Sequence, residues 1–130
     1  MKAKWLAPDL VGNPLKVAVC MTEKQYMKVM KQMNITDIPK WVADGKDATV
    51  HHFEGKPERD YVTVFCMRVR DETTVVEFAG LVVHECVHIW QEICERLGES
   101  HPSREFEAYS IQWLTQQVMW AALELQGYRT

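Results

Sequence analysis

The sequence predicts an α+β fold in which a small antiparallel sheet carries an N-terminal helix and two long C-terminal helices. Three observations predict this class. Strand-like segments fill much of the first half of the chain, one helix-like segment lies among them, and two long helical segments follow. The chain has 130 residues, a length that suits one domain spanning residues 1–130.

The first expected elements are a strand over residues 15–20 and a helix after it. The strand segment alternates in side-chain character. Thr22 is a suitable N-cap for the helix, and Asn34 is a suitable stop. Residues 41–42 are expected to begin a short strand that ends before Gly45.

The next two expected strands cover residues 48–53 and 61–69. The second is rich in β-branched and aromatic residues and is the strongest strand signal in the chain. Gly, Pro and Asp gather in residues 55–60, which is the chemistry of a turn. We therefore expect an antiparallel hairpin.

Two long helices are expected in the rest of the chain. Thr74 begins a Thr-x-x-Glu capping box for a helix over residues 75–97. Gly98 is the natural C-terminal stop of that helix. Ser103, after a proline, opens a second helix that ends near Gly127.

Composition and charge exclude several classes of function. The formal net charge is −3 at pH 7, which disfavours broad nucleic-acid binding through phosphate contacts. No segment has the roughly 18 apolar residues of a membrane span, and no secretory signal peptide is recognisable. The four cysteines lie in apolar segments without a Cys-x-x-Cys pair, which favours buried thiols in a reducing compartment. We therefore expect a cytoplasmic protein.

The motif that carries chemistry is His84-Glu85-Cys86-Val87-His88. Histidines at i and i+4 lie on one side of a helix, so His84 and His88 can converge on one Zn²⁺. Glu85 lies about 100° round the helix from His84, where its carboxylate can take a proton from an activated water. Cys86 points away from that side and is not expected to be a ligand.

The surroundings of the motif are apolar nearly all round the helix, which predicts a buried helix. Buried histidine and glutamate side chains need partners, and a metal ion would supply them. The alternative is that His84 and His88 are core histidines hydrogen-bonded to the backbone.

A catalytic zinc site needs a third protein ligand. His101, in the loop between the two long helices, is one candidate, and a glutamate of the last helix is another. Helical periodicity places Glu107 on the aliphatic stripe of that helix and Glu105 on a more polar one. Burial alone favours Glu107.

The pattern resembles the gluzincin class of zinc peptidases, especially the short single-domain zincin-like proteins of phage and bacterial genomes. The resemblance covers residues 74–127 and includes the segment Glu105-Phe106-Glu107-Ala108-Tyr109, with Tyr109 where the class usually has Asp. It implies a minimal zincin-like fold and Glu105 as the third zinc ligand. It also implies a peptide bound in extended form along an edge strand, formed by residues 48–53 or 61–69.

The expected function is therefore a zinc-dependent hydrolase, a metallopeptidase that acts on a peptide or protein with Glu85 as general base. The alternative is a non-catalytic zincin-fold protein with a structural zinc that binds a partner protein. The third hypothesis is a structural adaptor protein that binds no metal. His51 and His52, adjacent in a strand, face opposite sides, with one of them exposed. Tyr109 is the only suggested group for stabilising an oxyanion.

Overall fold

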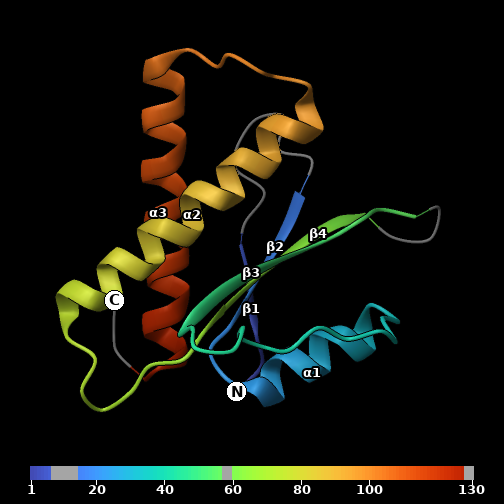
Figure 1. Ribbon diagram of the computed structural model, residues 1–130, viewed down its shortest axis with the longest axis vertical. Coiled ribbons are helices and arrows are strands. Elements are labelled where there is room, and N and C mark those ends of the chain that lie inside the picture. The colour runs from blue at the N-terminus through green and yellow to red at the C-terminus, as the bar shows by residue number, and fades with distance from the viewer. Residues whose placement is uncertain (7–14, 57–59, 128–130) are drawn as a thin grey trace.

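The computed structural model describes residues 1–6, 15–56 and 60–127 (Figure 1), and it confirms the α+β class. The sheet has four strands and there are three helices among these residues. In chain order the elements are β1 (Lys4–Trp5), β2 (Leu15–Cys20), α1 (Glu23–Gln32), β3 (Ala48–Phe53), β4 (Tyr61–Met67), α2 (Val75–Leu97) and α3 (Arg104–Leu125). Part of the turn expected over residues 55–60 lies outside the described residues.

The sheet is mixed rather than antiparallel, which corrects the prediction. Its strand order is β1-β2-β4-β3. The predicted hairpin is present, with β3 antiparallel to β4, but β4 pairs with β2 in parallel. The reason lies in the connection, because α1 and the loop after it cross over the sheet before β3 begins. The hairpin then returns β4 beside β2 in the same direction.

The segment at residues 41–42 is a bend and not the strand that the sequence suggested. Its side chains are used for tertiary packing. The Trp41 indole Nε1 donates a hydrogen bond to the Cys20 carbonyl at 3.3 Å, and Val42 is buried in the cluster around α1. Non-local packing therefore determines the conformation of this segment.

The predicted helix ends are confirmed. The hydroxyls of Thr22, Thr74 and Ser103 accept hydrogen bonds from backbone N–H groups of the first turns of α1, α2 and α3. Gly98 ends α2 in the left-handed conformation, with φ of 70°. Asn34 follows α1 with φ of 57°, as asparagine tolerates.

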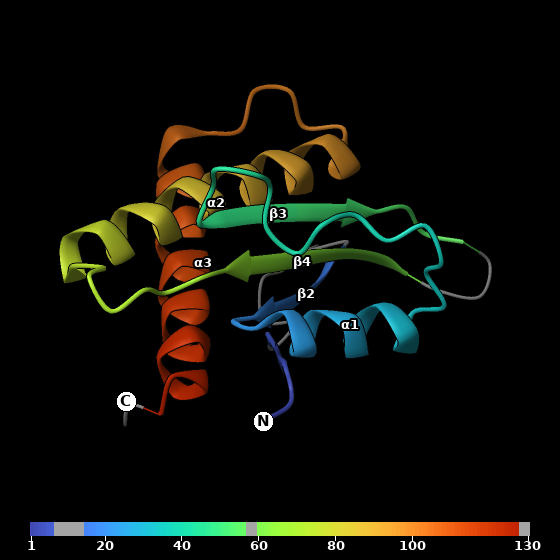
Figure 2. The same ribbon diagram turned by 60° about the horizontal axis from the view of Figure 1, so that its bottom comes forward.

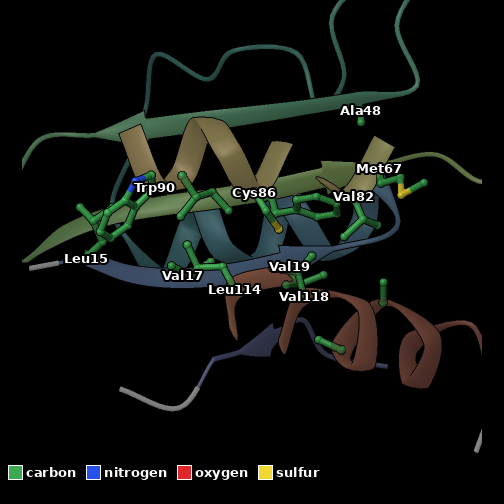
Figure 3. Close-up of a cluster of buried hydrophobic side chains, with 14 of the residues drawn as sticks. Leu15, Val17, Val19, Ala48, Met67, Val82, Cys86, Trp90, Leu114 and Val118 are labelled. Carbon is green, nitrogen blue, oxygen red and sulfur yellow. The ribbon is translucent and has the colours of Figure 1, made fainter. Parts of the chain in front are cut away.

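The helices cover the two faces of the sheet unequally (Figures 1 and 2). Helix α1 packs on one face with a cluster that includes Tyr26 and Met30, while α2 and α3 cross on the other. Figure 3 shows this second cluster, in which side chains of β2, α2 and α3 meet. Its labelled members are Leu15, Val17, Val19, Ala48, Met67, Val82, Cys86, Trp90, Leu114 and Val118.

All four cysteines are free thiols, and three of them are buried. Burial raises the pKa of Cys20 and that of Cys86 to about 12, so both stay protonated and unreactive near neutral pH. Among the described residues, no helix is both long and apolar enough to pass through a membrane.

Candidate active site

The motif histidines lie on the outer side of α2. His84 and His88 are exposed, and their ring centroids are 4.9 Å apart at an interplanar angle of 77°. The prediction of a helix buried all round is therefore wrong. The sheet and α3 cover only the side of α2 that carries Cys86, Ile89 and Trp90, and the apolar residue Val83 is exposed as well.

Glu85 lies on a different flank of α2 from the two histidines. Its side chain is only 7% exposed, and it lines a cleft of about 630 Å³ between α2 and β3. No hydrogen bond joins its carboxylate to another described residue. Because Glu85 is part of the cleft wall, its carboxylate can act on a ligand or water that enters the cleft.

The cleft is formed by side chains from two elements. They come from β3 and the residue after it, and from α2: Val50, His52, Glu54, Glu85, His88, Gln91, Glu92, Glu95 and Arg96. Glu92 and Arg96 form an ion pair at 2.9 Å, and the Arg96 guanidinium lies 4.3 Å from the centroid of the Tyr61 ring. The ion pair of Glu92 and Arg96 is therefore part of the cleft wall.

Strand β3 is at the edge of the sheet, whereas β4 is an interior strand. The Arg68 N–H donates to the Asp47 carbonyl at 2.7 Å, and this bond sets the alternation of the antiparallel ladder. Together with the register of β3 and β4, this bond shows which residues of β3 pair with β4 through their backbone. The backbone N–H and C=O groups of Ala48, Val50 and His52 point the other way, toward the open edge of the sheet. The side chains of the same three residues face α2.

The orientation of the His88 ring suits a metal ligand. Its Nδ1 lies 3.0 Å from Oε1 of Gln91. An amide oxygen only accepts hydrogen bonds, so Nδ1 carries the proton and Nε2 carries the lone pair. A histidine that ligates a metal is commonly oriented by such a bond from its other ring nitrogen.

The two adjacent histidines of β3 face opposite sides of the sheet, as predicted. The Nε2 of His51 lies 3.1 Å from the Trp41 carbonyl, and its ring packs 5.3 Å from that of Tyr26, on the α1 side. His52 is the more exposed of the two and faces the cleft. The alternation of side chains along a strand predicts that His51 and His52 face opposite sides of the sheet. The packing of α2 on one side then places His52 in the cleft.

The His52 ring is fixed to the sheet beneath it. Its Nδ1 lies 2.8 Å from the hydroxyl of Thr63, the directly opposed residue of β4, whose side chain is fully buried. Desolvation lowers the pKa of His52, and the nearby Arg96 and His88 lower it further, against the opposing charge of Glu92. The imidazole is therefore neutral at pH 7.

The candidates for a third zinc ligand are spread over the start of α3 and the loop before it. Glu105 is exposed in the first turn of α3. Glu107 is half-buried, and its carboxylate accepts a hydrogen bond from the Trp90 indole at 2.9 Å. His101 is exposed, with Nδ1 3.0 Å from the Ser100 hydroxyl. Tyr109 is 66% exposed.

The described residues contain no group of three His, Cys, Asp or Glu side chains placed to hold a metal ion. His84, His88 and Glu105 are thus not gathered around one point, although the first two are neighbours. The structure instead gathers Glu85, His88 and His52 around the cleft. Comparison with family models, with curated proteins and with solved structures finds no match to this chain.

Proposed function

We propose that this chain is a zinc-dependent hydrolase, most specifically a metallopeptidase, with Glu85 as the general base. The observation that carries the proposal is the placement of Glu85. The residue is only 7% exposed, and it lines a cleft beside His88. A carboxylate in the wall of a cleft, within reach of a bound substrate or water, is suited to take up a proton during hydrolysis.

The two motif histidines are the proposed zinc ligands. They would fill two of the four positions of a tetrahedral zinc site. Their rings are neighbours, and the Nε2 lone pair of His88 is available because Gln91 occupies Nδ1. Zinc, when bound, polarises a peptide carbonyl and makes water acidic enough to act as a nucleophile near neutral pH. We propose Glu105 as the third ligand because Glu107 is already bonded to Trp90. Zinc binding would have to bring Glu105 up to the two histidines, since the three side chains are not gathered around one point in this structure.

The proposed substrate is a peptide in extended form. Ala48, Val50 and His52 present backbone donors and acceptors at the open edge of β3, where a peptide can pair as an added strand. Such a peptide would pass beside the cleft that holds Glu85 and His88. We place this activity in the cytoplasm, which the four free cysteines support.

Metal analysis is the direct test of the zinc site. We expect about one zinc per chain in the purified wild type and essentially none in His84→Ala, because one imidazole and a third ligand hold zinc poorly. The matched control is His51→Ala, which removes an imidazole from the α1 side of the sheet and should leave the zinc content unchanged. Wild-type protein that takes up no zinc on titration would contradict the proposal.

Two variants of α3 identify the third ligand. We expect Glu105→Ala to weaken zinc affinity by roughly 10- to 100-fold, while Glu107→Ala keeps the affinity and loses stability. The loss should be about 1–3 kcal/mol, because the indole N–H of the buried Trp90 is left without its acceptor. Zinc titration and chemical unfolding measure the two effects. The reverse pattern of zinc affinities would assign Glu107.

A second candidate function is a non-catalytic zincin-fold protein with a structural zinc that binds a partner protein. The exposure of His84 and His88 favours it, because the metal would sit at a surface that a partner can cover. The two functions differ in their dependence on Glu85. If Glu85→Gln keeps full partner binding and the wild type cleaves no member of a peptide library, the binding function is correct.

A further inference from the structure

We propose that His52 is a further catalytic residue, whose Nε2–H donates a hydrogen bond to the carbonyl oxygen of the scissile peptide bond as that oxygen gains negative charge. The inference rests on the proposed function. It concerns a residue outside the His-Glu-x-x-His motif, on the other wall of the cleft.

The first support is position. His52 of β3 and Glu85 and His88 of α2 line the same cleft from opposite sides. A peptide paired with the open edge of β3 would run past the backbone of Val50 and His52. The His52 side chain leaves β3 on the side that faces α2 and lines the cleft there.

The second support is the bond that orients the ring. Thr63 is fully buried directly beneath His52, and its hydroxyl lies 2.8 Å from Nδ1. When the hydroxyl donates to Nδ1, the ring proton must be on Nε2, because a neutral imidazole carries only one. The proposal takes the Thr63 hydroxyl as the donor to Nδ1, which makes Thr63 a positioning residue and leaves the Nε2–H of His52 for the cleft.

The third support is the charge state. A neutral imidazole with a fixed N–H is already arranged for an oxygen that gains charge, so no reorganisation is needed during the reaction. The lowered pKa of His52 keeps the ring neutral at pH 7. A protonated ring would instead be attracted to the carboxylate of Glu92.

The tautomer is tested without any substrate. We expect ¹⁵N spectra of the protein, with and without zinc, to show His52 protonated at Nε2. In Thr63→Val, which keeps the shape of the buried side chain but removes the hydroxyl, the preference should weaken. A proton on Nδ1 in the wild type would overturn the proposal whatever the activity of the protein.

The catalytic role is tested by kinetics on the zinc-loaded protein with a fluorogenic peptide that the wild type cleaves. Removing one donor to a developing oxyanion typically costs about 10²-fold in rate. We expect His52→Ala to lose about that factor in kcat with little change in KM, and Thr63→Val to lose roughly tenfold. His52→Gln, whose amide N–H can replace the donor, should recover part of the rate.

His51→Ala is the matched control, since it removes the neighbouring imidazole on the far face of the sheet. Its kcat should equal that of the wild type under conditions where both are folded. If His52→Ala matches His51→Ala in kcat, the role of His52 is refuted while the proposed function stands. If the zinc-loaded wild type cleaves no peptide, the proposed function is refuted, and the catalytic role of His52 with it.

Discussion

Replacing Glu85 with Gln is expected to lower kcat by about 10³-fold or more while the protein keeps its zinc. General acid–base catalysis by a positioned side chain contributes about 10²–10⁴-fold, and Gln has the shape of Glu without its basicity. The variant should not be less stable than the wild type, because the buried Glu85 carboxylate makes no hydrogen bond to a described residue. The Gln side chain has the same size and can occupy the same place in the cleft wall.

The measurements are peptide hydrolysis, zinc content and the thermal unfolding midpoint. Glu92→Gln is the matched control, because it neutralises another carboxylate of the same cleft that is paired with Arg96 and not assigned to catalysis. It should keep most of the activity. A Glu85→Gln variant that is folded, holds zinc and remains fully active would remove Glu85 from the mechanism.

Replacing Trp90 with Ala is expected to lower the free energy of unfolding by about 3–5 kcal/mol. The Trp90 side chain of α2 is 2% exposed and packs in the cluster that α2 forms with β2 and α3. Its ring meets that of Phe106 with centroids 5.6 Å apart, and its Nε1 donates to Glu107. The substitution therefore removes a large apolar volume, an aromatic contact and a hydrogen bond at the α2–α3 crossing.

Trp120→Ala is the matched control in urea unfolding. That tryptophan is 48% exposed on α3, so its loss should cost less than about 1 kcal/mol. Trp90→Phe separates the two contributions, because it keeps most of the ring but cannot donate to Glu107. It should lie between Trp90→Ala and the wild type. Equal effects of Trp90→Ala and Trp120→Ala would mean that the crossing of α2 and α3 contributes little to stability.

The local features of the fold follow from the sequence. The three N-caps, the left-handed Gly98 and the bounds of α2 all depend on residues within one turn of one another. The same holds for the His84–His88 pair, because a spacing of four brings two side chains together on any helix. The pairing of β3 with β4 is also local, since the two strands lie close together in the sequence.

The direction of β2 relative to β4 is not a local property. Two strands far apart in the chain become parallel because α1 and its loop cross the sheet between them. Side-chain alternation is the same in parallel and antiparallel strands, so no pattern within β2 carried this information. The identity of the edge strand depends on the same topology.

The properties of the candidate site also separate into local ones, which the sequence predicts, and non-local ones, which depend on the fold. The sequence by itself determined the helix that carries the motif, the adjacency of His84 and His88, and the opposed faces of His51 and His52. Only the tertiary structure decided that the histidine side of α2 is exposed, that Glu85 is buried and that His52 joins it across the cleft. The reason is physical: backbone geometry sets how side chains radiate from one element, whereas exposure and convergence depend on which neighbour covers each side.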